Sequence, residues 1–223
     1  ELDHELAPRG LKRLFFITSH PSDLKLRILE AMRDCPTVCE YLHLPAQHGS
    51  NAQLRAMRRG YTAEKYREIA ALAREYVPDV CIASDFIVGF PGETDEDFEQ
   101  AKQIIRDDGF TQSFIFKYSP RPRTRSFDMM QDDVPEEVKK ARNNELLAVQ
   151  METAAALNKQ RIGRVEEVMC EGESKRDATR YGGRSRGHQI VVWPHDRRSN
   201  PGDIVRVRIT DTTALTLTGE RID

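Results

Sequence analysis

Near the middle of the chain runs Val80-Cys-Ile-Ala-Ser-Asp-Phe-Ile-Val-Gly-Phe-Pro-Gly-Glu-Thr94, an apolar segment that ends in a glycine-rich turn. Its first part is rich in β-branched side chains and predicts a strand over 80–88. Thr94 is a candidate N-cap for a helix over 95–107, where apolar side chains recur at helical spacing. A strand, a short turn and a helix in this order form the repeating unit of a parallel α/β sheet.

The same alternation extends to both sides of this segment. Because parallel strands need a crossover between them, helices that separate strands fit a parallel sheet. We therefore predict an α/β fold with parallel strands in this part of the chain. The further strands are expected at residues 12–18, 39–44 and 112–118, and the helices at 23–33, 51–59 and 63–76.

The last part of the sequence follows another pattern. Asp133-Val-Pro-Glu-Glu137 has the features of a helix start, with an N-cap before a proline in the first turn, and Gly163 is a candidate end for the long helix that follows. Short alternating segments then predict a small all-β domain, which we expect to be a five-stranded barrel. These segments are 165–170, 189–193, 204–209 and 214–217. The expected domains are 1–134, 135–161 and 162–223.

Composition excludes several classes of protein. The chain has 223 residues, of which 39% are hydrophobic and 31% charged, so it can bury a core and is not generally disordered. Its longest apolar runs, such as 14–17 and 190–193, are far shorter than the roughly 18 residues of a membrane span. Four cysteines are too few and too dispersed for a disulfide scaffold, so we expect a cytoplasmic protein without a membrane partner.

Polar or glycine-rich residues follow each predicted strand. These residues are 19–21, 45–50, 89–94 and 119–121. Because ligands bind beyond the carboxyl ends of parallel strands, we expect a ligand site there. Ser50 either caps the helix that follows it or contacts a ligand. The two glycines of 89–94 favour close approach of the backbone to a cofactor over a simple turn.

The histidines and cysteines do not predict a metal site. His20 and His48 have no second ligand at metal spacing, so packing or hydrogen bonding is the favoured role. Cys35 and Cys39 form a C-x-x-x-C pair, but Leu42 stands where an iron–sulfur loop would need its third cysteine. The two remaining cysteines lie in apolar strands and are expected in the core.

Basic residues gather in two places. Arg121, Arg123 and Arg125 follow the last parallel strand and could contact phosphates. A second group precedes the strand at 189–193 and suits a groove for a nucleic-acid backbone, with Tyr181 available to stack on a base, although a solvated surface is the alternative. Its members are Lys175, Arg176, Arg180, Arg184, Arg186 and His188.

Taken together, several segments resemble the MiaB-type tRNA methylthiotransferases. They are 18–21 (TSHP), 41–50 (YLHLPAQHGS), 57–62 (MRRGYT), 84–94 (SDFIVGFPGET), 116–122 (FKYSPRP) and 133–137 (DVPEE). In that family a radical S-adenosylmethionine (SAM) domain precedes a TRAM β-barrel that binds tRNA. The resemblance implies a partial (β/α) radical-SAM barrel, a connecting helix and an OB-like TRAM barrel.

The family's reaction converts N6-isopentenyladenosine next to the anticodon to its 2-methylthio derivative. The resemblance implies SAM and two 4Fe–4S clusters as cofactors of a full-length parent. The tRNA anticodon region and an electron donor protein are the implied partners. The ribosomal-protein methylthiotransferases are close relatives and stay an alternative, as does a tRNA-binding module without chemistry.

Eight positions are implied as SAM contacts by the family's motifs. Gln47 and Ser50 would contact the ribose or carboxylate. Asp85, Ile87, Gly89 and Glu93 match the region beside the adenine, with Asp85 where the motif has a glycine, and Tyr118 and Ser119 fall near the adenine edge. Neither cluster-binding cysteine set of the family is in this sequence, which begins at Glu1. We therefore expect a C-terminal fragment that is inactive alone.

Overall fold

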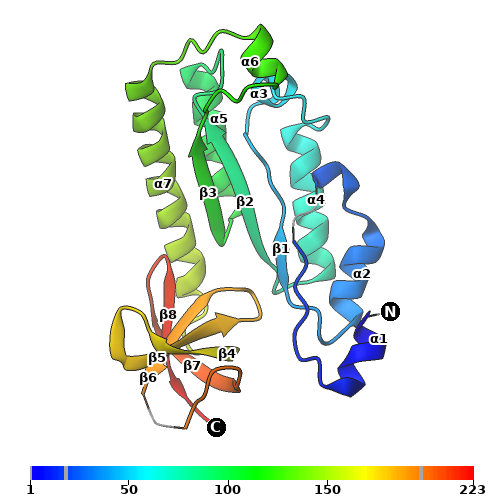
Figure 1. Cartoon of the computed structure of the whole chain (residues 1–223), viewed down its shortest axis with the longest axis vertical. Helices are drawn as coiled ribbons and strands as arrows, with labels where there is room; N and C mark the ends of the chain where they lie inside the picture. The colour runs from blue at the N-terminus through cyan, green and yellow to red at the C-terminus, as the bar shows by residue number, and fades with distance from the viewer. Residues whose placement is uncertain (1, 18–19, 196–197) are drawn as a thin grey trace.

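The computed structural model describes residues 2–17, 20–195 and 198–223. An α/β part and a closed β-barrel are joined by the long helix α7, Glu136–Lys159 (Figure 1). This arrangement confirms the predicted order of a parallel sheet, a connecting helix and a small all-β domain.

The α/β part is built on a three-stranded parallel sheet of order β1-β2-β3. Its strands are β1 (Tyr41–His43), β2 (Cys81–Val88) and β3 (Gln112–Lys117). The helices are α1 (Leu2–Leu6), α2 (Leu26–Asp34), α3 (Asn51–Ala56), α4 (Ala63–Tyr76), α5 (Asp95–Asp108) and α6 (Arg125–Met129), with 3₁₀ turns at Ala7–Arg9 and Pro21–Asp23.

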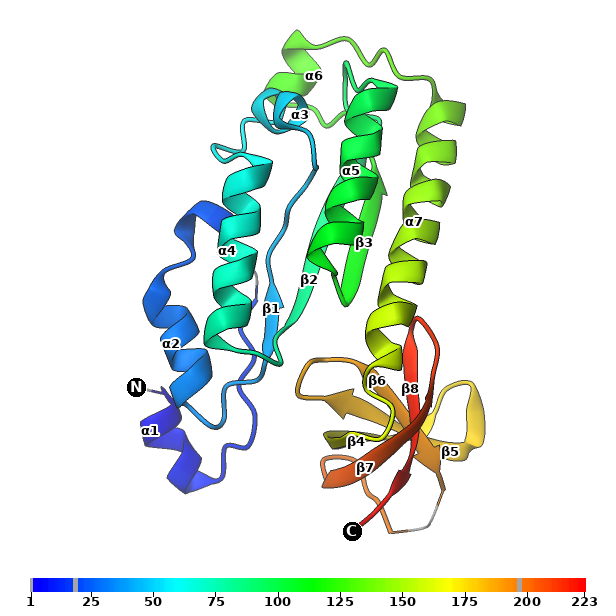
Figure 2. The same ribbon diagram turned by 180° about the vertical axis from the view of Figure 1, so that it is seen from behind.

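Helices α4 and α5 cover one face of this sheet, as Figure 2 shows from behind. The apolar stripes of these helices pack on β2, and Tyr66, Phe86 and Phe110 are almost fully buried between the layers. On β3 the alternate residues Phe114 and Phe116 remain 43% and 53% exposed. Over the described part of the chain, no helix covers that opposite face, which is seen in Figure 1.

The first predicted strand is wrong. Over 12–17 the backbone forms a single parallel bridge between Leu14 and Val38, while residues 18–19 lie outside the described ranges. Leu14 donates to the Thr37 carbonyl at 2.7 Å and accepts from the Cys39 amide at 3.0 Å. Phe15 still meets Tyr41 at the start of β1, with the ring centroids 6.3 Å apart, but among the described residues the backbone bridge at Leu14 does not extend into a ladder.

The barrel has five strands, as predicted from the sequence, and the structure shows their closed order to be β4-β5-β6-β8-β7. Trp193 and Val207 lie in its core with no exposed surface. One strand was not predicted, because the segment 177–185 lacks apolar alternation and forms β5. The strands are β4 (Val165–Ser174), β5 (Asp177–Ser185), β6 (Ile190–Pro194), β7 (Ile204–Thr212) and β8 (Thr216–Arg221).

The start of α7 also differs from the prediction. Pro135 itself is the N-cap residue and offers no side-chain hydrogen bond, whereas Asp133 accepts a 2.8 Å bond from the Gly92 amide. Asp133 therefore fixes the loop after β2 rather than the helix end. At the other end α7 stops at Lys159, and the amide of Gly163 pairs with the Ile209 carbonyl of the barrel.

No helix in the part of the chain that the structure describes combines the length and the apolar character needed to cross a lipid bilayer.

Candidate functional site

A cavity of about 620 Å³ lies at the carboxyl ends of the parallel strands. Its walls come from the ends of β2 and β3, the turn after α3, and the segment that leads into α6. Six predicted site residues line it, namely Gln47, Asp85, Ile87, Tyr118, Ser119 and Arg121. These residues are distant in sequence and converge because parallel strands end at one edge of a sheet.

Gln47 is held on the cavity wall by its backbone. Its φ of 67° lies in the left-handed region, which non-glycine residues rarely adopt. The Gln47 amide donates to the Asp85 carbonyl at 2.8 Å, and the Gln47 carbonyl accepts from the Ile87 amide at 2.9 Å. Pairing with β2 thus fixes this residue beside the two cavity residues of that strand.

The opposite wall is fixed at Tyr118. Its amide donates to the Val88 carbonyl at 2.8 Å, and its ring meets Phe90 edge to face with the centroids 4.9 Å apart. The ammonium group of Lys139 lies 5.3 Å from the centroid of the Tyr118 ring. On the β2 wall, His43 Nε2 lies 3.1 Å from Asp85 Oδ1, so this carboxylate already has one partner.

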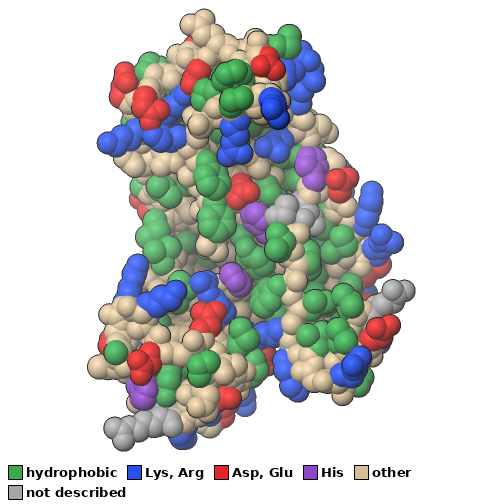
Figure 3. All heavy atoms as spheres, viewed as in Figure 1, with side chains coloured by type: hydrophobic (Ala, Val, Ile, Leu, Met, Phe, Trp, Pro, Cys, Tyr) green, Lys and Arg blue, Asp and Glu red, His purple; other side chains and the backbone are tan. Residues whose placement is uncertain are grey.

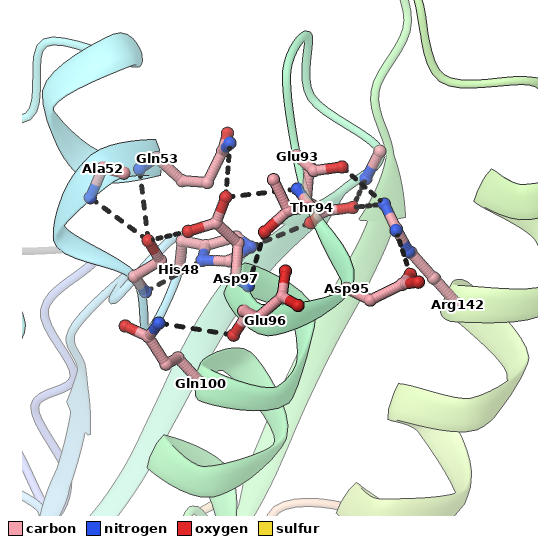
Figure 4. A network of polar contacts seen from close by, with 12 residues as sticks. His48, Ala52, Gln53, Glu93, Thr94, Asp95, Glu96, Asp97, Gln100 and Arg142 are labelled. Carbon is pink, nitrogen blue, oxygen red and sulfur yellow. Dashed lines mark hydrogen bonds and ion pairs between the residues drawn. The ribbon is translucent and has the colours of Figure 1, made fainter.

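Glu93 does not line this cavity, although it was predicted to contact the cofactor. Its side chain is fully buried, and its carboxylate is 2.8 Å from His48 Nε2 and 2.7 Å from Arg142 Nη1 (Figure 4). The same carboxylate accepts from the Gly89 amide at 2.7 Å, so it holds the loop that follows β2. Gly89 itself lies against Lys139 and is also outside the lining.

Ser50 belongs to the same buried region. Its hydroxyl accepts from the amides of Ala52 and Gln53 and donates to Asp97, so the predicted N-cap of α3 is confirmed. Gln53 does not close a capping box on Ser50, because its side chain donates to Asp97 at 3.3 Å. The network joins the loop after β1 to the start of α5.

The surroundings of this network shift the pKa values of two of its charged groups. Burial raises the pKa of Asp97, but the hydrogen bonds from Ser50, Thr94 and Gln53 outweigh it and leave the pKa below its ordinary value. Burial lowers the pKa of Arg142, but hydrogen bonds and charges of Asp95 and Glu93 outweigh it and raise the pKa. Both groups are therefore held in their charged forms.

The next feature is the arrangement of the side chains that could bind a metal ion. Within 2–17, 20–195 and 198–223, no three His, Cys, Asp or Glu side chains form a group that could hold a metal ion. All four cysteines are free thiols, and Cys39, Cys81 and Cys170 are buried. Burial raises the pKa of Cys81 to about 11, which disfavours the thiolate.

The predicted RNA-binding residues of the barrel have different surroundings. Lys175 and Arg176 are exposed at the β4–β5 turn, and Arg180 pairs with Asp177 at 3.3 Å. Arg184 donates to the His188 carbonyl at 3.1 Å. In the first basic group, Arg123 is exposed with a φ of 68° and does not line the cavity.

Tyr181 is not available to stack on a base, which corrects the prediction from the sequence. Only 6% of its surface is exposed, and its ring stacks on His195 with the centroids 4.2 Å apart. The ring also packs on Trp193 in the barrel core. The alternation of β5 turns this position inward, which could not be predicted without recognising the strand.

Arg186 joins the barrel to the α/β part. Its guanidinium forms two 2.7 Å bonds to the carboxylate of Glu40 and donates to the Val38 carbonyl at 2.8 Å. On the other side of this joint, Arg13 donates to the Arg184 carbonyl at 2.7 Å and to Glu167. These contacts occupy three of the five N–H donors of the Arg186 guanidinium and pair its charge with Glu40, so this residue holds the two parts of the chain together.

We expect an Arg186→Ala variant to lose about 1–3 kcal/mol of unfolding free energy, because Glu40 keeps a partly buried charge without its partner. Urea unfolding measures this loss. Lys175→Ala is the matched control, since its side chain is exposed, and it should leave stability unchanged. Unchanged stability of Arg186→Ala together with weakened RNA binding would contradict this role.

Two cavity arginines, Arg58 and Arg59, were not assigned to the site from the sequence, whereas Arg125 was predicted at the ligand end. Arg58 and Arg59 follow the short helix α3, and Arg125 begins α6. The adjacent pair in 57–62 was quoted as a motif without a role, and Arg125 was noted only as a possible phosphate contact. Their convergence depends on how two loops pack over the strand ends, which local patterns do not encode.

Comparison with known proteins agrees with this architecture. The profile of the Radical SAM superfamily matches residues 2–105, and that of the TRAM domain matches residues 159–222. The solved structure of coproporphyrinogen III oxidase (HemN) from Escherichia coli, a radical SAM enzyme, has a TM-score of 0.50 over 74% of this chain and 45% of its own. At 13% identity this likeness concerns the fold alone.

Among curated proteins, the chain is 45% identical to the tRNA-2-methylthio-N(6)-dimethylallyladenosine synthase of Rhodopirellula baltica over 94% of this chain and 45% of that protein. It is 42% identical to the enzyme of the same name from an Acidovorax species, over 95% of this chain and 47% of that protein. The chain thus spans about half the length of these relatives. With both domains present in this order, the chain belongs to the MiaB-type branch of the Radical SAM superfamily.

Proposed function

We propose that this chain is part of a tRNA methylthiotransferase that converts N6-isopentenyladenosine next to the anticodon to its 2-methylthio derivative in the cytoplasm. The names of the relatives support the reaction, and the TRAM match supports an RNA substrate. In this proposal residues 1–134 hold the cofactor, 135–161 connect the two parts, and 162–223 bind tRNA.

The observation that carries the proposal is the composition of the cavity at the strand ends. Its lining includes Gln47, Asp85, Ile87, Tyr118 and Ser119, which are five of the eight positions that the family's motifs implied for SAM. The apolar side chains of Ile87 and Phe90 can contact the adenine, while polar groups of Gln47 and Asp85 can bind the ribose or the amino acid end.

When bound, SAM supplies the radical and the methyl group of the reaction. This chain's residues would fix the cofactor's position, and Ser50 and Glu93 would act through the loops that they hold. A 4Fe–4S cluster does not fit the described cysteines, of which three are buried and none is grouped with other ligands. We infer that the ligands of both clusters, and the site of the electron donor, belong to the rest of the parent enzyme. The chain alone is then inactive.

Nucleoside analysis of tRNA tests the proposal. Mass spectrometry of digested tRNA from cells without the parent gene should show no 2-methylthio-N6-isopentenyladenosine and an accumulation of N6-isopentenyladenosine. Reintroduction of the intact gene should restore the modified nucleoside. Normal tRNA modification together with loss of a methylthio group from a ribosomal protein would instead support the protein-modifying relative.

A further inference from the structure

Basic side chains dominate the lining of the cavity at the strand ends. Among the residues that the structure describes, five basic side chains line it and one acidic side chain, Asp85, does so. Lys117 forms an ion pair with Glu136, whereas no described acid forms an ion pair with the other four. We call these four the arginine rim: Arg58, Arg59, Arg121 and Arg125. Lysine and arginine side chains are seen gathered near α3 and α6 in Figure 3.

The arginine rim is carried by backbone that is fixed on both sides of the cavity. Arg58 has a φ of 58°, and the amides of Arg58 and Arg59 donate to the carbonyls of Arg55 and Leu54 at 3.0 Å. On the other side, the Thr124 hydroxyl donates to the Arg121 carbonyl at 2.7 Å and caps α6. A non-glycine residue in the left-handed region is strained and persists where the surroundings impose it.

Arg59 also carries a buried polar atom without a partner. Its Nε is buried and donates no hydrogen bond to any described group. A buried donor in this state is uncommon in folded proteins and indicates a missing acceptor. Because Arg59 lines the cavity, an anionic ligand in the cavity is the natural source of that acceptor.

SAM does not account for this excess of positive charge. At neutral pH it carries one carboxylate against an ammonium and a sulfonium group, so its net charge is positive. The single carboxylate of SAM can match only one of the four arginines that form no ion pair with a described acid, so most of this charge is left without an anionic partner. A nucleic-acid strand, by contrast, carries one phosphate per nucleotide, and arginine binds phosphate through paired hydrogen bonds.

The rest of the lining suits a nucleobase. Phe116 and Tyr118 present rings, and Met57 and Met130 present flexible apolar surface to the cavity. Aromatic side chains beside a basic track are typical of sites for single-stranded nucleic acid, where bases stack on the rings. A volume of about 620 Å³ lies within the usual range for ligand sites.

We infer that the arginine rim binds the phosphodiester groups on either side of the target nucleotide and so guides its base to the cofactor. This inference rests on the proposed function and assigns the phosphates to the RNA substrate. An extended peptide has no charged backbone, so it leaves the four arginines without matching acceptors. The rim therefore favours an RNA over a protein substrate.

A salt titration with an anticodon stem-loop RNA tests the inference. The two double variants are R58Q/R59Q and R121Q/R125Q, and binding of the full chain is followed by fluorescence anisotropy at several salt concentrations. Each should bind roughly tenfold more weakly, and the slope of log K against log salt should fall by about 0.7 for each lost contact to single-stranded phosphate. R55Q/R106Q is the matched control, since these exposed arginines do not line the cavity. It should keep the wild-type slope.

A neutral linkage in the RNA makes the test specific for phosphate. Methylphosphonate linkages on both sides of the target adenosine should weaken binding to the wild-type chain, but they should not further weaken binding to the quadruple variant R58Q/R59Q/R121Q/R125Q. Additive losses would mean that the arginines and these phosphates act independently, which overturns the inference. Thermal unfolding should be the same for all variants, because the rim arginines form no ion pair with a described residue.

The RNA-binding experiment gives different outcomes if the inference is wrong and if the proposed function is wrong. RNA binding with unchanged salt slopes in both double variants overturns the inference and leaves the proposed function intact, because the barrel alone would then bind the RNA. Absence of RNA binding by the wild-type chain contradicts both. Binding of a peptide in place of RNA, weakened by the same substitutions, would assign the rim to a protein substrate.

Discussion

A Glu93→Ala variant should lose about 3–5 kcal/mol of unfolding free energy, because the substitution removes the carboxylate that pairs with buried groups. The Glu93 side chain has no exposed surface and contacts both His48 and Arg142. Of its two acidic partners among the described residues, Arg142 would keep Asp95, which is largely exposed. Chemical denaturation at constant pH measures the loss.

The same substitution should also weaken SAM binding by the parent enzyme. The Glu93 carboxylate accepts the Gly89 amide, and this glycine directly follows β2, which carries two cavity residues. The loop after β2 would therefore lose its fixed position, and the affinity for the cofactor should fall without a change of any residue in the lining. Isothermal titration with SAM measures this effect.

Glu96→Ala is the matched control for both measurements. Glu96 lies three residues after Glu93 in the first turn of α5, but its side chain is exposed and no contact of its carboxylate with a described residue holds the loop. A double-mutant cycle with Arg142→Met should give a coupling energy above about 1 kcal/mol for the pair. A loss below about 1 kcal/mol for Glu93→Ala would show that the network does not hold the loop.

The sequence was sufficient where the signal was local. The residues of α4 were predicted at the observed bounds because their apolar side chains repeat at helical spacing between a cap and the next turn. The capping role of Thr94 was predicted for the same reason, and the structure has it in a reciprocal pair with Asp97. The parallel order of three strands followed from alternation of strands with helices.

The sequence was insufficient where a role depends on a distant partner. Arg186 and Glu40 are 146 positions apart in sequence. Arg186 was therefore grouped with the basic residues around it, although it connects the barrel to the α/β part. Glu93 carries the acid of the motif, but its partner Arg142 is 49 positions away on α7. Strand β5 was missed because Gly183 and Ser185 take inward positions where apolar residues are usual.

The arginine rim illustrates both situations. The position of Arg121 beyond the last parallel strand was enough to predict it near the ligand. Arg58 and Arg59 lie beyond a helix, and nothing in their spacing indicates that the turn after α3 lies over the strand ends. Only the packing of this turn beside the segment before α6 brings the two pairs to one cavity.

A Gly49→Ala variant should lose at least about 3 kcal/mol of unfolding free energy, because the new methyl group has no space. A Cβ at this position would overlap the carbonyl group of Gln100 and lie 3.0 Å from the amide nitrogen of Ala101. Both atoms belong to the backbone of α5, which cannot move aside as a flexible side chain can. Helix α5 would have to shift away from the loop after β1.

That shift would also separate Ser50 from Asp97, because the two residues bridge the same loop and the same helix. We therefore expect Gly49→Ala to weaken cofactor binding as well as stability, measured by denaturation and by SAM titration of the parent enzyme. Gly182→Ala is the matched control, since its Cβ would make only ordinary contacts of 3.6 Å and more in the barrel. If Gly49→Ala were as stable as wild type, the close packing of this glycine against α5 would be contradicted.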